Sequence, residues 1–191
     1  MTRGRDGAAT TAAQVLKGEH RVIERVLDAV ERMVQRGTVD RTFFEPALAF
    51  FWNFADGCHH AKEENELFPV LESAESLPDG GMIKAMLRER EQGRALLGVV
   101  ASHLHAAADG ELRAVETVCR AAMSYVAVLR RHIQREDKVL FVRADAALGP
   151  EEQLLMLGAL HRADETNGNA AKRRHYTAVA DELARRSGAS A

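Results

Sequence analysis

Two segments of the chain place a glutamate four residues after a histidine: His59 precedes Glu63, and His132 precedes Glu136. Residues four apart lie one turn apart on the same face of an α-helix, so the side chains of each pair point the same way. Each pair also lies on an apolar stripe, where an unpartnered imidazole and carboxylate cost several kcal/mol. One such pair could be a hydrogen-bonded couple in the core. Two pairs in the same setting favour a metal site, because the facing helices of bundles supply inward histidines and carboxylates.

The two segments also match each other at a constant offset. In chain order, Trp52, His59, Glu63, Leu67 and Phe68 align with Tyr125, His132, Glu136, Leu140 and Phe141. This alignment selects the pair that begins at His59, rather than at His60, as the primary pair. Trp52 and Tyr125 each lie one heptad before a histidine, so we expect both to face the interior as packing or redox residues.

Three further polar residues bear on the site. His20 lies on the apolar stripe of its own helix, one turn after Leu16. A lone histidine there is more often a core residue, but the two pairs elsewhere favour a ligand. His60 lies at the edge of the inward face, either as a ligand or as a hydrogen-bond donor beside the site. Glu64 lies further round the helix, toward solvent, and is a candidate partner for a buried cation.

The composition is that of an ordinary globular protein of one-domain size. The 191 residues are 46% hydrophobic and 28% charged, and the net charge of −2 gives no electrostatic case for binding nucleic acid or an anionic membrane. No apolar run approaches the length of a membrane span. Two cysteines, Cys58 and Cys119, cannot form a disulfide framework. We therefore expect a soluble protein of a reducing compartment, the cytoplasm.

The elements that must position these residues are helices. Almost no run alternates with the period of a strand, so the chain predicts an all-α fold. Glycine, proline and polar clusters separate the helical stretches. We expect a disordered arm over residues 1–11, helices at about 11–36, 42–71, 81–105, 111–144, 151–163 and 170–186, and loops at 73–81, 109–110 and 165–169.

Four groups of residues along the chain form a specific combination. They are Glu19-His20, then His59-His60-x-Lys62-Glu63-Glu64 through Leu67-Phe68-Pro69, then Met86-Leu87-x-Glu89-x-Glu91-x-Gly93-Arg94, and His132-x-x-x-Glu136 through Leu140-Phe141. In this combination the chain resembles the hemerythrin-like family, also called HHE cation-binding domains. The resemblance implies an antiparallel four-helix bundle over residues 12–145, with residues 146–191 as additional C-terminal helices packed on it.

The resemblance also implies a cofactor and its ligands. The cofactor would be two iron ions bridged by carboxylates and by an oxo or hydroxo group. His20, His59, Glu63, His132 and Glu136 map onto ligands, with the two glutamates as bridges. Several members of the family use the position of His60 as a further ligand.

The chain departs from the family pattern at Arg90, where the family usually has a histidine ligand. A guanidinium stays protonated and offers no lone pair to a metal. Three outcomes are open: a di-iron site with an open position, a site reduced to one metal, or a metal-free core of salt bridges. We expect the first. Because Arg90 lies on the inward stripe of its helix, it must pair with Glu64, Glu63 or Glu136, or hold an anionic ligand such as a bound peroxide.

The chemistry of these side chains bounds the function. Imidazole with carboxylate suits iron, and also manganese or zinc. The expected function is a binding module that binds or senses dioxygen, nitric oxide or iron. The alternative is an enzyme that decomposes peroxide or oxidises a small substrate, and the third possibility is a metal-free helical protein. The pocket lining names no substrate, and the sequence does not specify an oligomeric state.

Overall fold

The chain is helical wherever it has regular structure among the described residues. The computed structural model describes residues 10–73, 81–166 and 169–188. Its elements are α1 (Ala12–Gln35), α2 (Arg41–Phe50), the π-helical η1 (Phe51–His60) and η2 (Glu63–Leu67), α3 (Phe68–Ser73), α4 (Gly81–Ala108), α5 (Leu112–Arg135), the π-helical η4 (Glu136–Leu140), α6 (Phe141–Ala147), α7 (Pro150–Glu165) and α8 (Asn169–Arg186). The predicted all-α fold is confirmed. Residues 1–9, 74–80 and 167–168, which include most of the predicted arm and parts of two predicted loops, lie outside the described residues.

The ends of the first helices follow from local hydrogen bonds. The Thr11 side chain accepts a hydrogen bond from the Gln14 N–H, and the Gln14 side chain accepts one from the Thr11 N–H, which caps α1. Asp40 caps α2 by accepting from the Thr42 N–H at 2.8 Å. Gly37, with φ 71°, adopts the left-handed conformation that ends the turn after α1.

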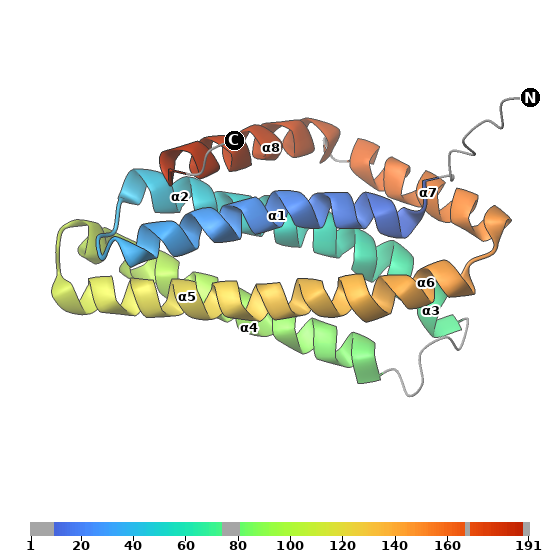
Figure 1. Ribbon diagram of the computed structural model, residues 1–191, viewed down its shortest axis with the longest axis horizontal. Helices are drawn as coiled ribbons and strands as arrows, with labels where there is room; N and C mark the ends of the chain where they lie inside the picture. The colour runs from blue at the N-terminus through green and yellow to red at the C-terminus, as the bar shows by residue number, and fades with distance from the viewer. Residues whose placement is uncertain (1–9, 74–80, 167–168, 189–191) are drawn as a thin grey trace, which may run out of the picture.

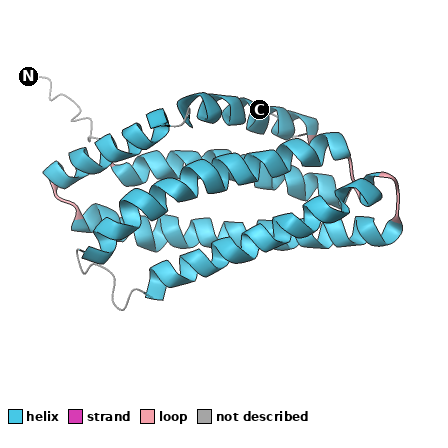
Figure 2. Cartoon of the chain, turned by 180° about the vertical axis from the view of Figure 1, so that it is seen from behind, coloured by secondary structure: helices cyan, strands magenta, loops and turns pink. Residues whose placement is uncertain are grey.

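Long helical segments lie side by side along the molecule (Figure 1). The elements from α2 to α3 follow one another directly, as do α5, η4 and α6. α4 packs along α5, and α1 contacts both α5 and α8. The front and rear views agree that α7 and α8 cover the side of the molecule where α1 and α2 lie (Figure 1; Figure 2). The functional residues therefore come from segments that surround one common interior.

A polar layer divides the apolar core into two clusters. On α1, Leu16 belongs to one cluster and Ile23 to the other, and the buried His20 lies between them. The same order recurs on other segments, with Met86, Arg90 and Leu97 on α4 and with Leu129, His132, Glu136 and Leu140 along α5 and η4. The buried polar side chains thus meet at one level, closed above and below by apolar packing.

Both histidine–glutamate segments contain π-helical turns. A π turn closes i→i+5 hydrogen bonds and therefore holds more residues than an α turn. Through η1, a heptad spacing no longer returns to the same face of the helix. The prediction that Trp52 faces the interior holds only in part. Trp52 is 41% exposed, but it also lines a cavity beside Arg90 and His132. Tyr125, on the regular helix α5, is buried as predicted.

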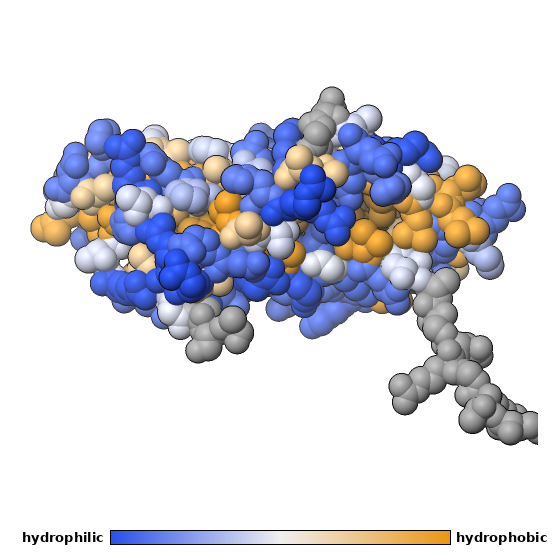
Figure 3. Space-filling model, turned by 90° about the horizontal axis from the view of Figure 1, so that it is seen from above, coloured by the Kyte–Doolittle hydropathy of each residue, from blue (hydrophilic) through white to orange (hydrophobic). Residues whose placement is uncertain are grey.

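One face of the molecule carries α7 and α8 (Figure 1; Figure 3). The face that carries α7 and α8 is mostly hydrophilic, with hydrophobic side chains gathered toward the end where α7 lies (Figure 3). Leu154 and Leu155 on α7 are among the exposed large hydrophobic residues. Among the described residues, no helix combines the length and the apolar character that crossing a membrane requires.

Candidate metal centre

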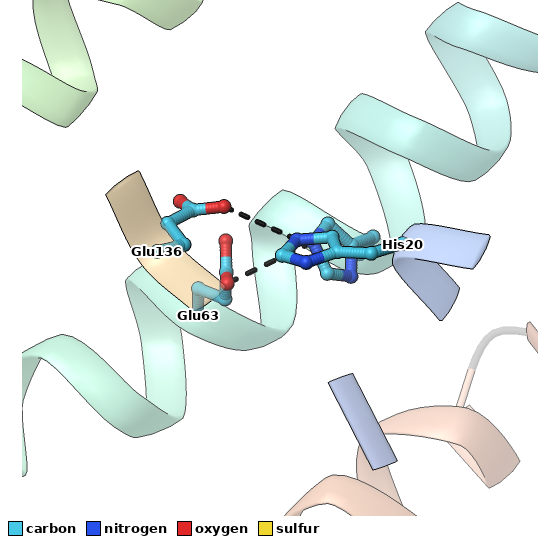
Figure 4. A group of neighbouring side chains, drawn as sticks. His20, Glu63 and Glu136 are labelled. Carbon is cyan, nitrogen blue, oxygen red and sulfur yellow. Dashed lines mark ion pairs between the residues drawn. The ribbon is translucent and has the colours of Figure 1, made fainter. Parts of the chain in front are cut away.

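Four side-chain atoms converge in the polar layer. They belong to His20 on α1, His59 at the end of η1, Glu63 at the start of η2 and Glu136 at the start of η4, and they lie within 4.8 Å of one another. All four residues are fully buried. Figure 4 shows the carboxylates of Glu63 and Glu136 beside His20, and its dashed lines mark the ion pairs of Glu136 with His20 and of Glu63 with His59. The predicted convergence of histidines and carboxylates from separate helices is therefore present for these four residues.

The converging atoms lack hydrogen-bond partners. His20 Nε2, His59 Nε2, Glu63 Oε1 and Glu136 Oε2 are the buried side-chain atoms without a partner among the described residues. His20 Nε2 lies 3.2 Å from Glu136 Oε2, and His59 Nε2 lies 3.7 Å from Glu63 Oε1, without hydrogen-bond geometry. Buried polar atoms are nearly always satisfied, so four orphans aimed at one point need a common partner. Two imidazole nitrogens and two carboxylate oxygens are a donor set that fits a transition-metal cation.

The outer nitrogens of the histidines are each bound by a carboxylate. His20 Nδ1 lies 2.7 Å from Asp137, and His59 Nδ1 lies 3.0 Å from Glu19. An ionised carboxylate only accepts hydrogen bonds, so Nδ1 carries a proton and donates it in each case. In a singly protonated ring, Nε2 then keeps its lone pair and faces the centre. Carboxylates hold metal-binding histidines in this tautomer and orientation in many proteins.

The carboxylate behind His59 belongs to a longer buried network. Glu19 also pairs with the Lys62 ammonium, and Lys62 Nζ donates to Asp164 Oδ1 at 2.9 Å. Asp164 lies on α7 and binds Arg173 on α8 at 3.0 Å. The orientation of His59 is thus tied to the C-terminal helices.

Sequence reasoning missed the roles of Asp137, Glu19, Lys62 and Asp164. Glu19 and Asp137 are each the chain neighbour of a predicted ligand, which is a signal that could have been used. Asp164 carries no such signal. It reaches Lys62 only because α7 folds back against η2.

Arg90 lies on the opposite side of the two glutamates. It is 3% exposed, and its Nη2 donates to Glu63 Oε2 and, at 3.1 Å, to Glu136 Oε1. Its Nη1 donates to Glu64 at 2.8 Å, and its guanidinium lies 4.8 Å from the ring centre of Phe68. The prediction that Arg90 faces inward and pairs with carboxylates is confirmed by these contacts.

Two of the predicted ligands lie on the Arg90 side of the layer. His132 Nε2 is 2.8 Å from Glu136 Oε1 and 3.4 Å from Arg90 Nε, and its Nδ1 is 3.0 Å from Glu89. The ring of His60 lies 5.3 Å from that of His132, and its Nδ1 is 3.3 Å from Asp56. His60 and His132 are therefore near the centre but outside the four-atom cluster.

The electrostatics reflect the charges packed into this layer. Burial disfavours the charged ring of His20, but the carboxylates of Asp137, Glu136 and Glu63 outweigh it and raise its pKa to about 9. For His132, burial is likewise outweighed by Glu136 and Glu89, and the pKa rises to about 9. Burial and the neighbouring Glu136 raise the pKa of Glu63. The carboxylates thus favour positive charge in the layer. Protons on the histidines can supply that charge, and so can a metal cation that replaces them.

A small cavity adjoins the Arg90 side of the layer. Its lining includes Trp52, His60, Arg90, Tyr125 and His132. Tyr125 is buried there, and burial raises the pKa of its hydroxyl well above the ordinary value. None of the four residues of the cluster is on this lining.

The sequence matches a known protein family. The model of the hemerythrin HHE cation-binding domain matches residues 11–144. Proteins from Mycobacterium bovis and from two strains of Mycobacterium tuberculosis, each described as an uncharacterized protein, are 32% identical to the chain over 136 residues. The match covers 69% of this chain and 52% of each relative, so the chain spans about half the length of these relatives. No solved structure matches. With more than half of its length matched by the family model, the chain belongs to the hemerythrin HHE cation-binding domain family.

Proposed function

We propose that the protein binds a metal cation, in the first place iron, through His20, His59, Glu63 and Glu136. One observation carries this proposal: among the residues that the structure describes, the buried side-chain atoms without hydrogen-bond partners belong to the same four residues that converge within 4.8 Å. The membership in a cation-binding family supports it independently. Manganese or zinc would also accept this donor set. No cysteine belongs to the cluster, which distinguishes it from a structural zinc site rich in thiolates.

The proposal includes an exogenous small ligand. Four protein donors leave positions for further ligands on an iron ion that prefers more than four. Dioxygen or nitric oxide, bound or sensed at such a position, are the ligands that the family resemblance implies. In this reading the carboxylates behind His20 and His59 fix the ligand rings, and the apolar clusters on either side keep bulk water away.

The proposed architecture follows from the same family membership. The segments α1, α2 to α3, α4, and α5 to α6 would form the antiparallel four-helix bundle of the family over residues 12–145. Residues 146–191 would form a C-terminal extension packed on that bundle, as the contacts of α8 with α1 and α2 support. We place the protein in the cytoplasm, and Cys58 and Cys119 form no disulfide that would argue otherwise.

The metal content of the full chain tests the proposal. We expect protein produced in iron-replete medium to contain bound iron, and His20→Ala and His59→Ala to lose most of it. His105→Ala is the matched control, because the His105 side chain is 77% exposed and lies outside the site. Circular dichroism verifies that each variant keeps its helices. Iron content that is equal in all four proteins would refute the proposed ligands.

A further inference from the structure

In each of the two glutamates of the centre, the two carboxylate oxygens point to opposite sides. Glu63 Oε1 and Glu136 Oε2 point into the four-atom cluster with the histidines of α1 and η1. Glu63 Oε2 and Glu136 Oε1 point to the other side, where both accept hydrogen bonds from Nη2 of Arg90. A carboxylate that bridges two metal ions likewise binds one ion with each of its two oxygens. Here one side offers unpartnered oxygens and the other side already holds a cation.

We propose that the guanidinium of Arg90 takes the place of a second metal ion, so that each chain binds one metal and not two. This inference rests on the proposed function and specifies its stoichiometry. Arg90 contributes a permanent positive charge, because a guanidinium is not deprotonated near neutral pH. That charge neutralises the outward oxygens of Glu63 and Glu136, which are fully buried and would otherwise require a second cation.

The donors on that side are already engaged. Besides the two glutamates, Arg90 binds Glu64 at 2.8 Å and the backbone oxygen of His60 at 3.3 Å, and its Nε lies 3.4 Å from His132 Nε2. His132 Nε2 is itself 2.8 Å from Glu136. The side chains that would ligate a second ion are thus in contact with the guanidinium. An ion there would have to displace Arg90 from these contacts.

The surroundings hold Arg90 in this position. Its side chain is completely buried, and its guanidinium lies over the ring of Phe68. The two-iron centre with an open position, which we expected from the sequence, does not fit this arrangement. A single ion on the His20 side, with Arg90 on the other side of the carboxylates, does fit it. The charges would then alternate across the layer, from the positive metal ion through the negative glutamates to the positive guanidinium.

Native mass spectrometry and elemental analysis of the full chain test the stoichiometry. The probes are Fe²⁺ under anaerobic conditions and, separately, Zn²⁺. Each is added in excess, and gel filtration then removes the unbound ion. We expect one ion per chain in the unchanged protein. Arg90→His and Arg90→Ala, which vacate the guanidinium position, should both rise above one and approach two. Arg90→Lys, which keeps a cation there, should stay at one.

The controls separate this inference from the proposed function. Arg88→His makes the same substitution on the exposed face of α4 and should leave the stoichiometry at one. Two ions in the unchanged chain would overturn the inference and leave the proposed function standing. The inference would also be overturned if the unchanged chain binds one ion and the folded Arg90→His and Arg90→Ala variants still bind one. An unchanged chain that binds no ion would refute the proposed function, and the inference with it. The measurement on the unchanged chain does not depend on the folding of any variant.

Discussion

Replacing Asp137 by alanine tests whether the carboxylates behind the histidines support metal binding. Asp137 Oδ1 accepts from His20 Nδ1 at 2.7 Å, and its other oxygen pairs with Arg21. The substitution removes the group that fixes the tautomer and orientation of the His20 ring. It leaves Nε2 and the other three donors of the centre in place. We therefore expect the variant to bind metal, but more weakly.

The expected magnitude follows from the charge that Asp137 helps to stabilise. Together with Glu136 and Glu63, and against the effect of burial, it raises the pKa of His20 from the ordinary 6.5 to about 9. That net shift corresponds to about 3 kcal/mol of preference for the protonated ring, which is what remains after the carboxylates have offset the penalty of burial. Losing a carboxylate behind a metal-binding histidine typically weakens affinity by about 10- to 100-fold, or about 1.4 to 2.8 kcal/mol.

Competition of the protein with a chelator of known affinity for Zn²⁺ measures this change. Asp137→Ala should lose about 10- to 100-fold in affinity, and Asp137→Asn should lose less, because its amide oxygen can still accept from Nδ1. Arg21→Ala is the control, since it removes the surface partner of Asp137 and leaves the bond to His20. An affinity of Asp137→Ala equal to that of the unchanged chain would refute the reasoning that His20 is an oriented ligand.

Three further predictions concern the C-terminal helices, a helix cap and the metal itself. Asp164→Ala should weaken Zn²⁺ affinity in the same chelator assay, because Lys62 loses its partner on α7 and the network that orients His59 loosens; an unchanged affinity would show that the network is only structural. Asp40→Ala should lower the free energy of unfolding by about 1 kcal/mol in urea titrations at pH 7, through loss of the α2 cap. The hydrogen bonds to Thr42 lower the pKa of Asp40 in the folded protein, so its contribution to stability is present above the ordinary pKa and is lost as the pH falls below it. The stabilities of the two proteins should therefore converge in acid. A difference that persists there would contradict the role of the Asp40 carboxylate as the cap. Removing bound metal with a chelator should lower the melting temperature. The loss in free energy of unfolding is about 2.7 kcal/mol if the free metal concentration was about 100 times Kd. An unchanged melting temperature would mean that the ion does not bind the native centre.

Much of the centre could be predicted from residue types and helical spacing. The histidine–glutamate pairs, His20 and the inward direction of Arg90 all follow from apolar stripes with a polar interruption, and the structure brings these residues into one layer. These features are local to single helices, where residues one turn apart share a face.

What spacing alone did not predict depends on geometry between and within helices. The partial exposure of Trp52 accords with the π turns of η1, which change the number of residues per turn and are not visible in a spacing of 3.6 residues. The contact of Asp164 with Lys62 depends on how α7 folds back. The contacts of Arg90 with both glutamates and with His132 depend on how far its side chain reaches across the layer.

Anomalous diffraction from crystals of the metal-loaded full chain tests the central claim most directly, because it locates each ion. We predict one anomalous peak per chain, at bonding distance from the Nε2 atoms of His20 and His59 and from Glu63 and Glu136, with the Arg90 guanidinium on the far side of both glutamates. A peak on the His132 side of the glutamates with Arg90 displaced, or no peak between the four residues, would contradict this account.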